Sequence, residues 1–240
     1  MALGFRSNYQ EIYMKLMLVA ATAVVLAACG GGGSDAASVA PNLKVEPPNA
    51  AILGYLDTTN VATTGFPFNG QFAGVTKRWK LPIAVKTNGE ARAVPAMDAI
   101  EAKLGYVVFD RTSLANNDEA SIARGLVLRQ GTSYLPTGAN PQAYCANVGN
   151  APFSGGWPAN SLTAPGVLSA RFYVNLDNPQ CTASADIVVH EIAHALGMGS
   201  HFKGFGDGPA ISADFWTVLA SLYGNPAGTA KADIVAKQSN

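Results

Sequence analysis

All three histidines of this 240-residue chain lie between positions 190 and 201, and the first two are four residues apart in the apolar run IVVHEIAHAL. Residues four apart lie on one face of an α-helix, so the imidazoles of His190 and His194 can reach a single metal ion. Glu191 projects about 100° further round the helix, where its carboxylate can act on a water bound to that ion. The run therefore predicts a helix over residues 183–196 that carries two metal ligands and a base.

The third histidine, His201, lies a few residues beyond the predicted end of this helix. Gly197 can adopt a positive φ and end the helix, and Gly199 adds a second flexible position before His201. Three imidazoles on one ion leave one position open, which is typical of catalytic zinc rather than structural zinc. Two alternatives stay open. Asp207 can serve as the third ligand in place of His201, or the histidines are core residues that bond to the backbone.

The segment HEIAHALGMGSH resembles the HExxHxxGxxH motif of the metzincin clan of zinc metallopeptidases, and within that clan the matrixin-like group. Four residues match the motif position by position, namely His190, Glu191, His194 and Gly197. The likeness extends over residues 75–227. It implies an α+β fold of the zincin type, with a twisted mixed sheet packed on two helices. The second of these helices bears the HExxH motif, and a small C-terminal subdomain with one helix follows it.

The chain differs from the clan's pattern at two places. The clan's third ligand falls at Ser200, whereas the histidine of this chain is one residue later, at His201. A bulge at Gly199 can absorb the extra residue, because glycine has no Cβ. The clan's Met-turn methionine has no counterpart, because Met198 is the last methionine of the chain. Another packed apolar group can support the floor of the site in its place.

The motif and the resemblance together predict a zinc endopeptidase that acts on peptide or protein substrates. Zinc lowers the pKa of a bound water towards about 7, and Glu191 would then act as general base and later as general acid. A peptide would lie extended along the edge of a sheet. One alternative is hydrolysis of something other than a peptide. Another is a non-catalytic surface lipoprotein with a structural metal site that binds a partner. The presence of Glu191 argues against the non-catalytic lipoprotein, since a structural site needs no base.

The charge of the chain argues against a nucleic-acid partner. Sixteen basic side chains balance sixteen acidic ones, and charged residues are only 13% of the total, so no basic field exists to hold a phosphate backbone. Hydrophobic residues make up 48% of the chain, which is enough to bury a globular core. We expect the domain to be a monomer.

The N-terminus predicts export and attachment to a lipid. Residues 16–28 read LMLVAATAVVLAA and follow Lys15. This run is shorter than the roughly 20 residues of a membrane span and is typical of a signal peptide. Together with Cys29 it ends in LAAC, which resembles the lipobox of bacterial lipoproteins. The resemblance implies a lipidated Cys29 that anchors the protein in the cell envelope, at the outer membrane. An ordinary cleaved signal beside a chance cysteine is the alternative.

Three regions are expected along the chain: a signal peptide at 1–28, the lipidated Cys29 and a flexible linker at 29–50, and a metallopeptidase-like domain at 51–240. In this domain, hydrophobic periodicity and turn residues predict strands at 77–85, 106–109, 125–129 and 169–176, helices at 95–104, 183–196 and 212–223, and a long loop at 131–166.

The two remaining cysteines belong to the exported part of the chain. Cys145 and Cys181 would meet an oxidising compartment after export, where a pair of thiols usually becomes a bridge. We therefore expect a Cys145–Cys181 disulfide, with two unpaired thiols as the alternative.

Overall fold

The computed structural model describes residues 43–45, 49–62, 72, 74–158, 160–163 and 165–240. All of them belong to one unit of the chain, Ala36–Asn240. The predicted signal peptide, Cys29 and most of the predicted linker lie outside the described residues. Within the described ranges, every helix is too short or too polar to cross a lipid bilayer.

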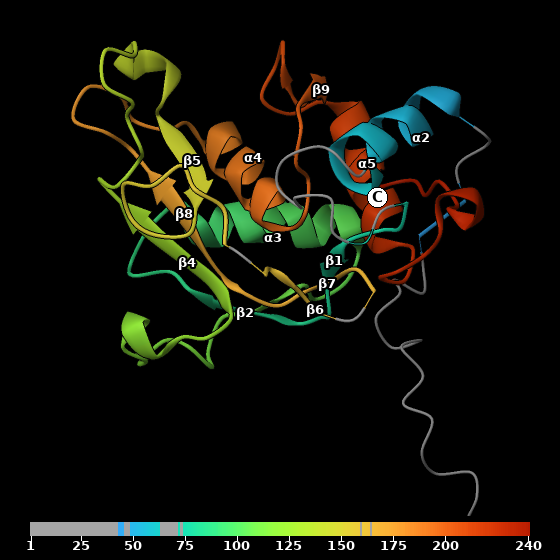
Figure 1. The fold of residues 1–240 in the computed structure, drawn as a ribbon, viewed down its shortest axis with the longest axis horizontal. Coiled ribbons are helices and arrows are strands. Elements are labelled where there is room, and N and C mark those ends of the chain that lie inside the picture. Colours follow the sequence, from blue (N-terminus) through green and yellow to red (C-terminus); the bar gives the residue numbers. More distant parts are fainter. Residues whose placement is uncertain (1–42, 46–48, 63–71, 73, 159, 164) are drawn as a thin grey trace, which may run out of the picture. The chain divides into compact units, whose positions relative to one another are not determined.

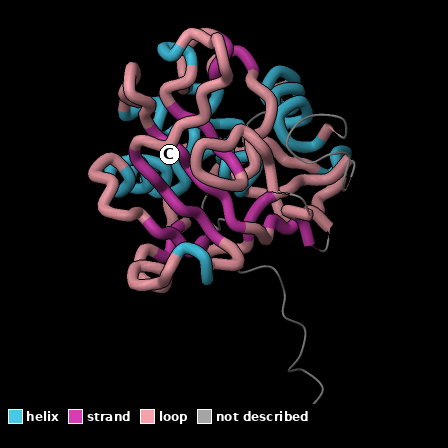
Figure 2. The backbone as a smooth tube through the Cα atoms, turned by 60° about the vertical axis from the view of Figure 1, so that its left-hand side comes forward, coloured by secondary structure: helices cyan, strands magenta, loops and turns pink. Residues whose placement is uncertain are grey.

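A five-stranded sheet carries the core. Its strands are β2 (Ile83–Lys86), β3 (Phe109–Asp110), β4 (Gly125–Gln130), β5 (Ala146–Gly149) and β8 (Arg171–Leu176). They lie in the order β3-β2-β4-β8-β5, and Figure 2 shows strands of this sheet running side by side. The pairings within the sheet are parallel except for β5, which runs antiparallel to β8. The antiparallel strand therefore forms one edge of the sheet.

Two helices, α3 (Ala93–Leu104) and α4 (Ala185–Ala195), lie on one side of this sheet (Figure 1). Helix α3 ends as predicted, because Gly105 takes a left-handed φ of 78°. The Ser184 hydroxyl caps α4 by accepting a hydrogen bond from the N–H of Ile187. Helix α4 packs against α3, β5 and β8. The helix that carries the HExxH motif is thus held beside the antiparallel edge strand.

Two predictions about strands were wrong in part. The predicted strand at 77–85 is two strands in different sheets, since β1 (Arg78–Trp79) pairs with β7 (Val167–Leu168) and β2 joins the central sheet. Pro82 lies between them and has no N–H to continue a ladder. The predicted loop at 131–166 contains β5 and also β6 (Leu162–Thr163). Both are short, and the β5 sequence ANVG has little β-propensity.

The remaining elements lie outside the five-stranded sheet and its helices α3 and α4. Helix α2 (Ala50–Leu56) runs into a π-helical turn, η2 (Asp57–Val61), and was not predicted. Helix α5 (Ala213–Tyr223) begins after Ser212 as predicted and packs against α2 and α3. The short strands β9 (Phe202–Lys203) and β10 (Gly206–Asp207) pair with each other after α4. Among the described residues, three 3₁₀ turns complete the elements: η3 (Glu119–Ser121), η4 (Pro141–Ala143) and η5 (Lys231–Asp233).

The described residues form a mixed fold of sheets and four α-helices, which agrees with the predicted α+β class. Packed residues also occur within the predicted linker. Leu43 is buried, and Val45 forms a β-bridge with Lys237 near the C-terminus.

Candidate metal centre

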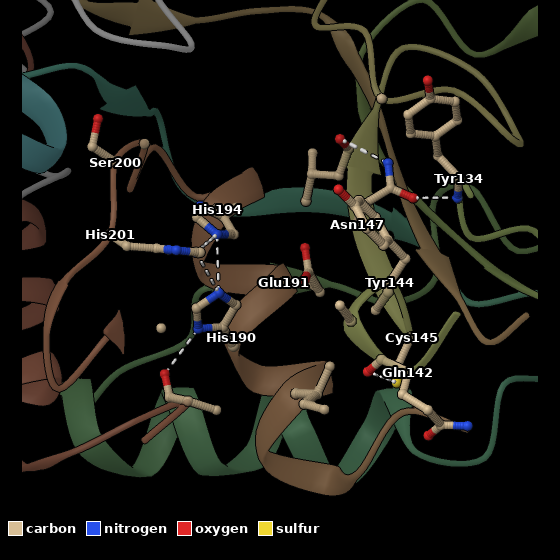
Figure 3. A pocket seen from close by; sticks show the side chains of 18 of the residues that line it. Tyr134, Gln142, Tyr144, Cys145, Asn147, His190, Glu191, His194, Ser200 and His201 are labelled. Carbon is tan, nitrogen blue, oxygen red and sulfur yellow. Dashed lines mark hydrogen bonds between the residues drawn. The ribbon is translucent and has the colours of Figure 1, made fainter. Parts of the chain in front are cut away.

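The Nε2 atoms of His190, His194 and His201 converge on one point (Figure 3), at pairwise distances of 3.0, 3.1 and 3.2 Å. Two nitrogens bound to tetrahedral zinc at about 2.0–2.1 Å lie about 3.3 Å apart. The observed spacing is close to this value. The three side chains therefore form a group that can hold a metal ion.

Backbone carbonyls orient two of the three rings. Nδ1 of His190 donates to the carbonyl of Ala210 at 2.8 Å, and Nδ1 of His194 donates to the carbonyl of Met198 at 2.5 Å. These bonds assign the ring proton to Nδ1, so each Nε2 presents a lone pair to the centre of the group. Two lone pairs 3.0 Å apart repel each other unless a cation lies between them. The hydrogen bonds therefore favour a metal site over a purely structural cluster of core histidines.

Burial keeps these imidazoles neutral. It lowers the pKa of His190 to about 4 and the pKa of His194 well below the usual 6.5. Burial also lowers the pKa of His201, although the nearby carboxylate of Asp207 acts in the opposite direction. A ligand imidazole must be unprotonated to bind a metal. The group is thus ready for a cation at neutral pH.

The turn after α4 selects the third imidazole. Gly197 ends the helical run as predicted, with a φ of 112°, and a Cβ at this position would lie only 2.6 Å from the carbonyl oxygen of Lys77. Ser200, where the metzincin pattern has its third ligand, points away from the imidazoles (Figure 3). Asp207 is exposed and lies outside the metal-binding group. The geometry favours His201 over Asp207.

An aromatic ring forms the floor of the group. Phe205 is fully buried, and its ring centroid lies 4.2 Å from that of His190, 4.7 Å from that of His194 and 5.6 Å from that of His201. The ring of Phe215 stacks behind it at 5.4 Å. Phe205 is therefore a packed apolar side chain that supports all three imidazoles.

Glu191 lies between the imidazoles and β5 (Figure 3). Its side chain is buried, and burial raises its pKa to about 8, while a hydrogen bond with the backbone of Val148 on β5 acts to lower it. A cation bound by the neighbouring imidazoles would favour the ionised carboxylate. Glu191 is therefore placed to take up and release a proton.

A pocket of about 670 Å³ opens over the imidazoles and Glu191. One wall consists of residues 142–148, which include most of β5, and the opposite wall consists of residues 199–201 with Gly206, Gly208 and Ala210. Strand β5 is at the edge of the sheet, and in the described parts of the chain no strand pairs with its outer side. Backbone groups of an edge strand thus border the pocket.

The two cysteines predicted to pair lie at disulfide distance, with Cα atoms 5.0 Å apart. Cys145 immediately precedes β5 and lines the pocket. Cys181 lies three residues before the N-cap of α4. The pair therefore links the pocket wall to the start of the helix that carries the motif.

Two further contacts support the end of this helix. The indole N–H of Trp79 donates to the carbonyl of Ala195 at 2.8 Å, and the Tyr223 hydroxyl donates to the carbonyl of Leu196 at 2.9 Å. The last carbonyls of a helix have no partner within the helix, so these buried bonds satisfy them. Trp79 is 116 positions from Ala195, and Tyr223 is 27 positions from Leu196. The hydrophobic periodicity of the sequence therefore could not predict these contacts.

Comparison of the chain with models of protein families, with curated proteins and with solved structures found no match.

Proposed function

We propose that the protein is a zinc-dependent endopeptidase. The observation that carries the proposal is the convergence of three neutral imidazoles beside a buried glutamate, at the base of a pocket bordered by an edge strand. A closed structural zinc site takes four protein ligands. Here the described residues offer three at one point, which leaves a position for a reacting group.

The donor set fits zinc. Imidazole nitrogen suits this ion, and two of the three rings have the backbone hydrogen bonds that commonly orient metal-bound histidine. When bound, zinc would activate water as a nucleophile and polarise the carbonyl group of a peptide bond.

Glu191 would carry the proton in the reaction. Its carboxylate accepts a proton from the attacking water and later delivers it to the leaving nitrogen of the peptide. The hydrogen bond with Val148 orients the carboxyl group against β5, and burial excludes competing water from it. A catalytic acid and base of this kind contributes about 10²–10⁴-fold to the rate.

Strand β5 would hold the substrate. An extended peptide can add to the free edge of a sheet through main-chain hydrogen bonds, which give affinity with little dependence on side chains. The pocket beside β5 contains the imidazoles, so a peptide docked on this edge passes the metal position. Peptide and protein chains are therefore the proposed substrate class.

The experiment compares purified wild-type protein with Glu191→Gln, measuring bound zinc and cleavage of casein and of a peptide library. We expect both proteins to bind one zinc and the variant to cleave at least about 100-fold more slowly. Zinc in both proteins with no cleavage by the wild type would contradict the proposal. It would favour the alternative, a surface lipoprotein with a structural metal site.

The proposed location is the cell envelope. A lipid on Cys29 would anchor the domain to the membrane through the Gly- and Ser-rich linker, since two or more acyl chains hold a protein stably on a bilayer. Metabolic labelling with a palmitate analogue tests this in wild type and Cys29→Ser. Label in the wild type alone supports the anchor, and no label in either protein contradicts it.

A further inference from the structure

Three contacts join the segment Ala50–Val61 to the turn at residues 197–202. The carbonyl of Thr59 accepts a hydrogen bond from the N–H of Gly199 at 2.6 Å, and the Asn60 side-chain amide donates to the carbonyl of Gly197 at 2.7 Å. The ring of Tyr55 stacks on that of Phe202, with centroids 4.7 Å apart and planes 15° apart. A segment more than 130 residues away in sequence thus holds both ends of the turn.

The side chain of Asn60 makes three hydrogen bonds to backbone groups. Its side-chain NH₂ donates to the carbonyls of Lys77 and Gly197, each at 2.7 Å, and its side-chain oxygen accepts the N–H of Lys77 at 2.8 Å. The residue is 1% exposed. It lies in the π-helical turn η2, where the N–H of Ala62 reaches back to the carbonyl of Asp57. Such turns are rare and occur frequently at functional sites.

The turn that Asn60 contacts carries the third imidazole, His201. Nδ1 of His190 and Nδ1 of His194 each bond to a backbone carbonyl, but in the described chain no hydrogen bond is made by Nδ1 of His201. The direction of the His201 ring therefore depends on the backbone that carries it and on its packing against Phe205 and Gly206. That backbone is anchored at Gly197 and Gly199 on one side of His201 and at Phe202 on the other.

We propose that Tyr55, Thr59 and Asn60 form a brace that positions His201 for metal binding, with Asn60 as its main positioning residue. The brace rests on the proposed metal site and adds to it a determinant outside the HExxH segment. Loss of an outer partner of a metal ligand typically weakens metal affinity by about 10–100-fold. The brace acts through the turn rather than on the ligand itself.

The primary test measures zinc affinity by chelator competition in the full chain for wild type, Asn60→Ala and a matched control, Asn225→Ala. Asn225 is also buried, donates to two backbone carbonyls and accepts one backbone N–H, but its partners are Ser221 and Val235. We expect Asn60→Ala to bind zinc at least about 10-fold more weakly and Asn225→Ala to stay within about twofold of the wild type. Equal affinities in all three proteins, or equal losses in both variants, would overturn the proposal.

A second pair of variants tests the brace independently of Asn60→Ala, so that a general loss of structure in that variant does not decide the result. Tyr55→Phe keeps the ring that stacks on Phe202, and Tyr55→Ala removes it. We expect Tyr55→Phe to keep wild-type zinc affinity and Tyr55→Ala to weaken it. No difference between these two variants would contradict a role for the stacked rings.

Hydrogen exchange separates failure of the brace from failure of the proposed function. The amide of Gly199 donates to Thr59, so in metal-free protein we expect Asn60→Ala to exchange faster at residues 197–203 than wild type or Asn225→Ala. If the wild type binds no zinc, the proposed function fails, and this measurement still decides the brace. Unchanged exchange over 197–203 in Asn60→Ala would reject it.

Discussion

The ring of Phe205 packs against the imidazole of His190 with centroids 4.2 Å apart, and it also contacts the other two histidines. One apolar side chain therefore limits the positions of all three proposed ligands. Because protein interiors are closely packed, a smaller residue at this position would allow the rings to move.

We predict that Phe205→Leu weakens zinc binding by about 10-fold, because it removes part of the surface on which the imidazoles rest. The control is Phe172→Leu, which changes another fully buried phenylalanine that packs on Trp79 and Trp157. Urea unfolding checks that the two variants lose similar stability. The prediction is wrong if Phe172→Leu weakens zinc binding as much as Phe205→Leu does.

The identity of the third ligand is decided by a second pair of variants. We predict that His201→Ala lowers zinc affinity by more than about 100-fold, beyond the usual effect of losing an outer partner, and that Asp207→Ala has little effect. Isothermal titration of metal-free protein with zinc measures both. A larger loss in Asp207→Ala would assign the ligand to the carboxylate.

A salt-bridge network of Arg92, Glu90 and Asp177 should make the stability of the protein sensitive to acid. Arg92 pairs with Glu90 at 2.7 Å and with Asp177 at 2.8 Å. Hydrogen bonds from Arg92 hold the pKa of Glu90 below its usual value. Burial raises the pKa of Asp177, but its bonds to Arg92 and Ala183 outweigh this and lower it. Because both carboxyl pKa values are lower in the folded state, their stabilisation is complete above the usual carboxyl range, at about pH 5, and is lost as the pH falls through the lowered folded-state values.

We predict that Arg92→Met destabilises the protein by about 2–3 kcal/mol at pH 7, somewhat less than the loss from a fully buried pair because Arg92 is partly exposed. The variant should also lose less stability than the wild type between pH 7 and pH 3.5. Urea midpoints at the two pH values measure this. Parallel losses in both proteins would show that the network is not the acid-sensitive element.

The Cys145–Cys181 pair links the pocket wall to α4, so we predict that reduction of this disulfide destabilises the protein. Closing a loop with a sequence separation of 36 stabilises a fold by roughly 3–4 kcal/mol in the chain-entropy model. The double variant Cys145→Ser with Cys181→Ser should therefore have a free energy of unfolding lower by roughly 3–4 kcal/mol, and it should unfold at a lower urea concentration. It should also match the reduced wild type. A further loss on reducing the double variant would point to another cause.

The long, periodic elements could be predicted from the sequence, and the short ones could not. Helices α3, α4 and α5 have apolar residues at helical spacing and clear end signals, such as Gly105 and Ser212. Strand β5 has only four residues and takes its place by pairing with β8, which is a long-range interaction. Helix α2 lies beside a Gly- and Pro-containing stretch, and this composition obscured the helical spacing of its apolar residues.

The sequence could likewise predict some residues of the candidate site and not others. His190, Glu191 and His194 share one helix, so their spacing alone predicts that they meet. The position of His201 depends on a turn whose path is set by distant residues, and the choice against Asp207 needed the structure. Phe205, Asn60 and Val148 reach the site from other segments and carry no motif.

X-ray absorption at the zinc edge of the purified, zinc-loaded protein tests the central claim most directly. We expect one zinc per chain with three imidazole nitrogens and one water oxygen at about 2.0–2.1 Å, and two imidazoles in His201→Ala. A protein that binds no zinc under these conditions would contradict the account. So would a zinc whose four ligands all come from the protein.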